Sequence, residues 1–408
     1  MYFWIKSILS FQLNYELFIA KRIIASKQHK NSVSSPIIKI SILAIAIGII
    51  VMLFSVATGV GLQKKIKEKI SGFNGDIQII NYDSNNSRIT VTPVFKNQDF
   101  YPDFTSVPNV KKVQVYATKA GIIRTPDEFE GIILKGVDQD YDWSFFEEYL
   151  KAGKLPEISA EISNEVLISA KTAARLSLKV GGEFHIFFVK NDPNKAPNSR
   201  KFNVSGIFNS GFEEFDEAFM IGDIKHIQRI NKWDTNQVGG FEIFVHDFDQ
   251  LQQTGSEVYE QIDPSLNAYT IAEKFPAIFE WLSLFDTNII VIIAIMILIA
   301  GINMITALLV LILERTQMIG ILKALGNHNW SIRKIFLYNA AFLIGKGLLW
   351  GNLIGVGLLL IQKYLGVITL NPETYYVNQA PVHLSIPALI WINLGTLLLC
   401  LLMLIVHS

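Results

Sequence analysis

The sequence has few of the residues that build metal centres and disulfide-bonded domains. Its 408 residues include a single cysteine, Cys400, which lies inside an apolar run. One cysteine excludes an intramolecular disulfide framework and a cysteine-based metal site. The seven histidines are scattered without metal-ligand spacing. Lone histidines in strand-like segments, such as His185 and His246, are more often structural than ligands. The sequence therefore predicts no metal site.

Motifs of catalysis and nucleotide binding are also missing. The sequence contains no Walker A pattern, no His-Glu-x-x-His and no nucleophile elbow. Lysine and arginine number 36, and aspartate and glutamate also number 36. This balance argues against a nucleic-acid partner, which requires a basic stripe. An enzyme is disfavoured, although a site assembled from scattered residues would leave no motif.

Apolar runs are what the sequence has in abundance, and half of its residues are hydrophobic. Each of four runs approaches or exceeds the ~20 residues needed to cross a bilayer as a helix. We predict transmembrane helices at 37–61, 287–313, 335–361 and 384–406, preceded by a cytoplasmic or interfacial helix within 1–36. The connecting segments are 62–286, 314–334 and 362–383.

Residues 73–286 differ in kind, because charged residues, proline, asparagine and glycine are spread throughout them. Strand-like runs occur at 76–80, 88–94, 129–137, 165–168, 183–189, 202–208 and 241–245. Helix-like runs occur at 170–177, 223–230 (with Asp223 as N-cap) and 250–262. This mixture predicts a membrane protein with four transmembrane α-helices and a large α+β extracytoplasmic domain inserted between helices 1 and 2.

Lysine and arginine beside the spans predict the topology. Lysines lie on both sides of the first span, so the later spans decide. Arg315, Lys323, Arg333 and Lys334 crowd the connection between spans two and three. We therefore expect the N-terminus, residues 314–334 and the C-terminus in the cytoplasm. Residues 62–286 and 362–383 are then expected on the other side of the membrane.

The connection between spans two and three contains a short amphipathic segment, residues 314–326. Ile319, Leu322 and Leu325 fall on one face at helical spacing, and Gly326 is a suitable end. Lying between two spans, such a helix is suited to be held by a partner at the membrane surface. The alternative is an interfacial helix that only connects two spans.

The third span combines a glycine repeat with a charge. Gly347, Gly351 and Gly355 recur every four residues and would let another helix pack closely. Lys346 lies near the middle of the span, where a charge is costly and is a functional-site candidate. Its alternative role is structural, facing a polar seam with Asn303, Asn352 or Asn393.

Residues 190–200 contain two prolines and three asparagines between two strand-like runs. This composition predicts a protruding, irregular hairpin tip. Composition by itself favours the alternative, a simple surface loop.

An ordered set of short motifs covers nearly the whole chain: residues 16–22, 41–48, 72–79, 134–138, 179–182, 204–208, 214–216, 314–326 and 372–376. Together they resemble the lipoprotein-releasing ABC transporter permeases (LolC/LolE), within the FtsX/MacB-type permeases. The resemblance implies a non-catalytic subunit that binds no cofactor itself. ATP would be used by a separate ABC ATPase, present in two copies. The other implied partners are a second permease chain (identical or paralogous), a lipoprotein substrate, a periplasmic lipoprotein carrier and membrane lipids.

The resemblance also implies roles for particular residues. Residues 314–326 correspond to the family's coupling helix, which implies ATPase-coupling roles for Glu314, Arg315, Ile319, Gly320, Ile321, Leu322, Lys323, Ala324, Leu325 and Gly326. The predicted hairpin tip occupies the place of a carrier-binding hook, with candidates Asp192, Pro193, Lys195, Pro197 and Arg200. Entry of lipoprotein between spans one and two implies a lipid-facing cavity with candidates Ile49, Met52, Phe54, Met296 and Ile299. The intramembrane polar candidates remain Asn303 and Lys346.

The resemblance leaves two alternatives of other classes. A MacB-like efflux permease for a small molecule or peptide would share the fold. An FtsX-like membrane regulator would use the outer domain to bind a cell-envelope factor. The expected location in each case is the cell inner membrane, with the large domain in the periplasm.

Overall fold

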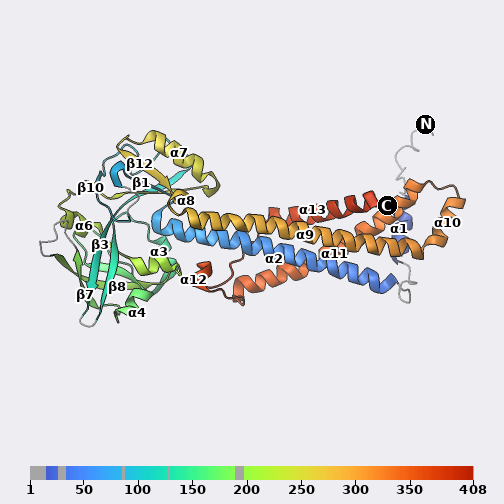
Figure 1. Cartoon of the computed structure of the whole chain (residues 1–408), viewed down its shortest axis with the longest axis horizontal. Helices are drawn as coiled ribbons and strands as arrows, with labels where there is room; N and C mark the ends of the chain where they lie inside the picture. Colours follow the sequence, from blue (N-terminus) through green and yellow to red (C-terminus); the bar gives the residue numbers. More distant parts are fainter. Residues whose placement is uncertain (1–14, 26–33, 85–87, 126–127, 189–196, 408) are drawn as a thin grey trace, which may run out of the picture. The chain divides into compact units, whose positions relative to one another are not determined.

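The computed structural model of the chain describes residues 15–25, 34–84, 88–125, 128–188 and 197–407 (Figure 1). Contacts divide the chain into two compact units. One, the membrane unit, takes in residues 1–63, 282–369 and 379–408. The other, the outer unit, takes in residues 64–281 and 370–378. The connection between the third and fourth spans thus contributes residues 370–378 to the outer unit, although the sequence suggested only a short separate loop.

Long helices dominate the membrane part of the chain. They are α1 (Tyr15–Ala25), α2 (Ser34–Asn74), α9 (Pro276–Glu314), α10 (Thr316–Ala324), α11 (Asn329–Leu365) and α13 (Ile386–His407). Among the described residues, four of them are long and apolar enough to cross a membrane: α2, α9, α11 and α13. The predicted fold class, four transmembrane helices with an α+β domain inserted between the first and second, is confirmed.

The glycine repeat of the third span lies against the first span. A side chain at Gly347 would meet Ile45, one at Gly351 would meet Ile49, and one at Gly355 would meet Leu53. The absence of these side chains lets α11 approach the backbone of α2, as the repeat predicted.

The outer unit is built on a mixed sheet. Its strands are β1 (Ile77–Asn81), β3 (Val110–Arg124), β4 (Phe129–Val137), β5 (Leu150–Gly153), β6 (Glu165–Ser169), β7 (Glu183–Phe188), β8 (Asn198–Phe208), β9 (Phe219–Asp223), β11 (Gly240–Val245) and β12 (Leu266–Thr270). Their order among the described residues is β12-β1-β11-β3-β4-β9-β6-β8-β5, with β7 paired to β3 and β8. The β4–β9 and β6–β8 pairs are parallel and the others antiparallel. A separate short pair joins β2 (Val94–Phe95) to β10 (Gln237–Val238).

Short helices connect these strands (Figure 1). They are η2 (Tyr82–Ser84), α3 (Ser144–Tyr149), α4 (Ala170–Arg175), α5 (Glu213–Ala218), α6 (Ile224–Asn231), η3 (Phe248–Gln250), α7 (Leu251–Gln261), α8 (Ile271–Lys274) and α12 (Pro372–Tyr375). Asp223 is the N-cap of α6, as predicted, and its side chain accepts a hydrogen bond from the Lys225 amide. Thr270 and Glu273 form a capping box at the start of α8.

The outer end of α2 is anchored in an aromatic cluster. The Phe73 ring lies 4.8 Å from the Phe215 ring and 5.3 Å from the Phe146 ring, measured between centroids. A side chain at Gly72 would collide with the ring of Phe145. Gly72 is therefore required for this packing, and the helix continues past it. The helix ends at Asn74, and Gly75 follows with a φ of +69°.

The longest strand was missed by the sequence analysis. β3 has 15 residues and pairs with β11, β4 and β7. Its Gln114 and Thr118 are buried although both are polar, and they find partners in Glu242 and Thr90. The predicted strand at 88–94 is wrong, and only Val94, its last residue, is in a strand, the short β2.

Candidate functional site

The predicted coupling segment forms α10, whose end is defined by backbone geometry. The Gly326 amide donates to the Lys323 carbonyl at 3.0 Å, and the Asn327 amide donates to the Leu322 carbonyl at 3.0 Å. Gly326 has a φ of +89°, and this combination is a Schellman motif. The prediction that the helix ends at Gly326 is confirmed. Glu314 is the last residue of α9, and Arg315 is the N-cap of α10.

The two faces of α10 differ in burial. Leu322 is buried, and Ile319 packs against the same apolar cluster of the membrane unit. Ile321 is 56% exposed, and a side chain at Gly320 would meet nothing within 4 Å. Leu325, the third residue of the predicted apolar face, is 77% exposed. It is the C-cap of α10, whose last helical residue is Ala324.

The N-terminal helix α1 supports this region. Ala20 and Ile23 of α1 are buried in the cluster that also holds Leu322. The Asn327 amide group donates to the Tyr15 hydroxyl at 3.0 Å, and the Ser331 hydroxyl donates to the Glu16 carboxylate at 3.0 Å. The sequence predicted a cytoplasmic or interfacial helix here. In the structure, α1 packs against α10 and forms hydrogen bonds with Asn327 and Ser331, which follow α10.

Within the outer unit, three chain segments meet at Tyr376. The Lys69 ammonium of α2 donates to the Tyr376 carbonyl at 2.8 Å. The Tyr376 ring stacks on Phe212 at 4.6 Å and meets the Trp281 ring of α9 edge-on at 5.9 Å. The residues that enter the outer unit from the first, second and third spans therefore contact one another. The sequence analysis noted residues 372–376 as a motif but assigned them no role.

The candidates for a lipid-facing cavity are mostly inside the membrane unit. Ile49 and Met52 are buried, and Phe54 and Met296 pack partly buried against the same cluster. Only Ile299, at 41% exposure, has an open surface. Ile49 and Met52 are therefore covered within this chain, Ile49 by the close approach of α11 at Gly351, and a lipid-facing cavity at these residues stays a prediction.

The intramembrane polar residues do not form the suggested seam. The side-chain amides of Asn352 and Asn393 hydrogen bond to each other at 2.6 and 3.0 Å. Lys346 is exposed instead, with its ammonium 4.6 Å from the Phe342 ring centroid. The carbonyl of Asn303 accepts a hydrogen bond from the Ser41 hydroxyl at 3.4 Å.

The hook candidates fall in the sequence between β7 and β8, which form an antiparallel pair, and in the first residues of β8. Asp192, Pro193 and Lys195 lie outside the described residues. Pro197 is exposed, directly before β8. Arg200 belongs to β8 and pairs with Ile186, so it is part of the strand and not of an irregular tip.

Comparison with known families agrees with this architecture. Residues 40–258 match the family described as MacB-like periplasmic core domain. Residues 290–408 match the family described as FtsX-like permease C-terminal. The first match begins in α2 and ends in α7, and the second covers most of α9 and all of α10, α11 and α13.

Similar proteins include transmembrane proteins of lipoprotein-releasing systems. LolC of Xylella fastidiosa is 20% identical over 383 residues, covering 91% of this chain and 90% of the relative. LolE of Haemophilus influenzae is 21% identical over 397 residues, covering 91% of each. Among solved structures, the periplasmic region of MacB from Actinobacillus actinomycetemcomitans has 14% identity and a TM-score of 0.33, covering 53% of this chain and 98% of that one.

The core-domain match alone spans more than half of the sequence, and the second match accounts for most of the remainder. Both matches fall on the elements that the four spans and the inserted α+β domain require. The chain therefore belongs to the FtsX/MacB-type ABC transporter permeases, and transmembrane proteins of lipoprotein-releasing systems are among the proteins it is similar to.

Proposed function

We propose that this chain is the permease subunit of an ATP-driven complex that releases lipoproteins from the inner membrane towards a periplasmic carrier. The observation that carries the proposal is the similarity to LolC and LolE along about nine-tenths of both chains. The chain itself makes no chemical step in this scheme. ATP is used by a separate ATPase, two copies of which bind a pair of permease chains.

The exposed face of α10 is the proposed contact with the ATPase. Gly320 and Ile321 leave a shallow apolar surface, and Arg315 and Lys323 add positive charge. These positive charges, with Arg333 and Lys334, favour a cytoplasmic location for α10. The outer unit then lies in the periplasm.

The outer end of α2 is the proposed route for the mechanical signal. α2 is one uninterrupted helix from Ser34 to Asn74, so its two ends move together. Its last turns are fixed in the outer unit by Phe73 and by the Lys69–Tyr376 hydrogen bond. A displacement of the membrane end of α2 is therefore delivered to the sheet of the outer unit.

Release of a lipoprotein from the membrane requires free energy from an external source. Withdrawing acyl chains from a bilayer costs roughly 0.8 kcal/mol for each methylene group that loses its apolar surroundings. A periplasmic carrier with an apolar cavity recovers this free energy, and ATP binding and hydrolysis make the transfer directional.

Depletion of this protein, followed by fractionation of lipoproteins between the two membranes, tests the proposal. We expect lipoproteins to accumulate in the inner membrane. If their distribution stays normal while tolerance of an exported compound falls, the chain is an efflux permease. Normal distribution with a defect in cell-envelope growth would indicate the regulator.

A further inference from the structure

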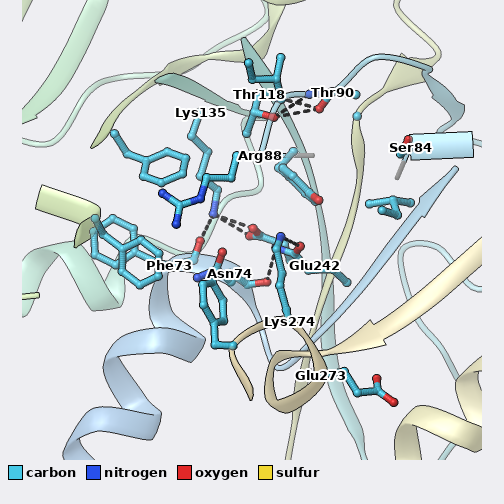
Figure 2. A pocket seen from close by; sticks show the side chains of 18 residues that line it. Phe73, Asn74, Ser84, Arg88, Thr90, Thr118, Lys135, Glu242, Glu273 and Lys274 are labelled. Carbon is cyan, nitrogen blue, oxygen red and sulfur yellow. Dashed lines mark hydrogen bonds and ion pairs between the residues drawn. The ribbon is translucent and has the colours of Figure 1, made fainter. Parts of the chain in front are cut away.

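The outer unit contains a cavity that the proposed transport function does not use. Its volume is about 190 Å³, and it lies between the end of α2 and the strands β1, β3, β4 and β11. η2, α5, β9, α8 and residues 88–90 also contribute to its wall. Figure 2 shows Lys135 and Lys274 reaching into it from opposite sides of the view.

The positive charge of one of these lysines, Lys135, is fully compensated by its neighbours. The Lys135 ammonium donates to both carboxylate oxygens of Glu242, at 2.7 and 2.9 Å, and also to the Phe73 carbonyl. Glu242 accepts a further hydrogen bond from Gln114 at 3.1 Å. The side chains of this pair are 3% and 1% exposed. The two charges of this buried pair neutralise each other, and the additional hydrogen bonds satisfy their remaining polar atoms.

The positive charge of the second lysine, Lys274, is not compensated by a carboxylate in this way. The Lys274 ammonium donates to the side-chain oxygen of Gln78, which is neutral. The nearby carboxylates are engaged elsewhere, Glu242 with Lys135 and Glu273 in the capping box of α8. Arg88, the other cation of the wall, forms an ion pair with Glu214. One positive charge at this cavity therefore has no dedicated carboxylate among the described residues.

A buried hydroxyl lines the same cavity. Ser84, at the end of η2, is 6% exposed, and its oxygen has no hydrogen-bond partner within the described part of the chain. A buried polar atom without a partner carries a desolvation cost that a ligand would remove. Figure 2 shows Ser84 and Lys274 at opposite sides of the cavity.

The remaining wall is largely aromatic. Phe73, Phe215, Phe219, Phe275 and Tyr116 all line the cavity. Such a wall favours a ligand with an apolar body, whereas Lys274 favours an anionic head. A singly charged head suits the single unmatched lysine.

We propose that this cavity binds a small amphipathic organic acid, with its carboxylate paired to Lys274 and its apolar body against the phenylalanines. The proposal is independent of lipoprotein release. It concerns a ligand that would be sensed or held by the outer unit at the point where α2 enters it.

Binding is tested on the full chain in lipid nanodiscs by calorimetry, with hexanoate as the probe and hexanamide as its neutral counterpart. We expect hexanoate to bind and hexanamide to bind at least about tenfold more weakly, because the amide cannot form the ion pair. Equal binding of the two, or no binding of hexanoate, would overturn the proposal.

Variants separate the ion pair from a general loss of structure. Lys274→Met should weaken hexanoate binding by at least about tenfold. Lys274→Arg should retain binding, since it keeps the charge. Lys151→Met, at an exposed lysine of β5, is the matched control and should bind like the parent chain. Unchanged binding by Lys274→Met would refute the assignment.

Proton uptake supplies a second readout. Burial lowers the pKa of Lys274 to about 8. Lys135 and Arg88 also lower this pKa, and Glu242 opposes them. Tyr116 of β3 and Glu273 on α8 itself complete the titratable groups around the cavity. A bound carboxylate favours the charged ammonium, so binding at pH 9 should take up a proton in the parent chain and none in Lys274→Met. Binding without proton uptake by the parent chain would contradict the ion pair.

Discussion

Burying polar side chains in the outer unit costs desolvation free energy, and only their interaction partners offset it. Lys135 and Glu242 are 107 residues apart in sequence and lie on β4 and β11. Burial lowers the pKa of Lys135, and the contact with Glu242 opposes that shift. Because both side chains lie away from water, removing one leaves the other as an uncompensated buried charge.

Lys135→Met is therefore expected to destabilise the outer unit by about 3–5 kcal/mol. The double variant Lys135→Met/Glu242→Leu should recover most of this loss, since neither charge remains. Denaturant unfolding of the purified full chain measures both. The matched control is Lys201→Met, which breaks an exposed pair with Glu183 and should cost less than about 1 kcal/mol. A small effect of Lys135→Met would show that water reaches the pair.

The burial of His226 allows a prediction of how the stability of the outer unit depends on pH. It is 2% exposed, its Nε2 donates to the Ser163 carbonyl at 2.9 Å, and its Nδ1 is buried without a partner among the described residues. Burial lowers the pKa of His226 below its ordinary value of 6.5. In the unfolded chain the imidazole takes up a proton as the pH falls through 6.5, whereas the folded chain resists it. The unfolded state then binds more protons, so stability decreases as the pH falls.

We expect the free energy of unfolding to decrease between pH 7.5 and pH 5.5, with His226 contributing at most about 1.4 kcal/mol per pH unit. In His226→Gln, which does not titrate, this contribution should be absent. Denaturant unfolding at both pH values measures the difference. An unchanged pH dependence in the variant would contradict the assignment.

At the scale of one element, α10 combines a rigid end with an open face. The Schellman motif at Gly326 ends the helix, and Leu322 fixes its inner side. Gly320 on the outer side has space for any side chain within the chain itself. A bulky residue there should thus leave the fold intact and obstruct only a partner.

Gly320→Trp is expected to reduce co-purification of the ATPase at least about tenfold, a loss of about 1.4 kcal/mol or more in binding free energy. Charge reversal at Glu314 should act in the same direction. Gly131→Trp in β4 is the control, because a side chain there also meets nothing within 4 Å. Normal recovery of the ATPase with the Gly320 variant would count against a coupling role for α10.

For the whole molecule, the central prediction is that the outer unit and α10 lie on opposite sides of the membrane. Cys400 is the one cysteine of the sequence and is buried, so the parent chain should react little with a maleimide. Single cysteines replacing Lys232 in the outer unit and Lys323 in α10 should react with an impermeant maleimide from opposite sides of sealed vesicles. Labelling of both from the same side would refute the topology and, with it, the proposed transfer of movement across the membrane.

The sequence by itself determined the features that depend on neighbouring residues. The four spans follow from the length of their apolar runs, the end of α10 from Gly326, and the start of α6 from Asp223. The glycine repeat of α11 also predicted close helix packing, because small residues have the same effect whatever their partner.

Only the tertiary structure decided which distant residues meet. It pairs Lys135 with Glu242, brings residues 370–378 into the outer unit and inserts β3 at the centre of the sheet. It also buries Ile49 and Met52, which a sequence pattern cannot distinguish from lipid-facing residues, because both environments favour the same apolar side chains. Local patterns report the preference of each segment, whereas burial and charge pairing depend on contacts between segments far apart in the chain.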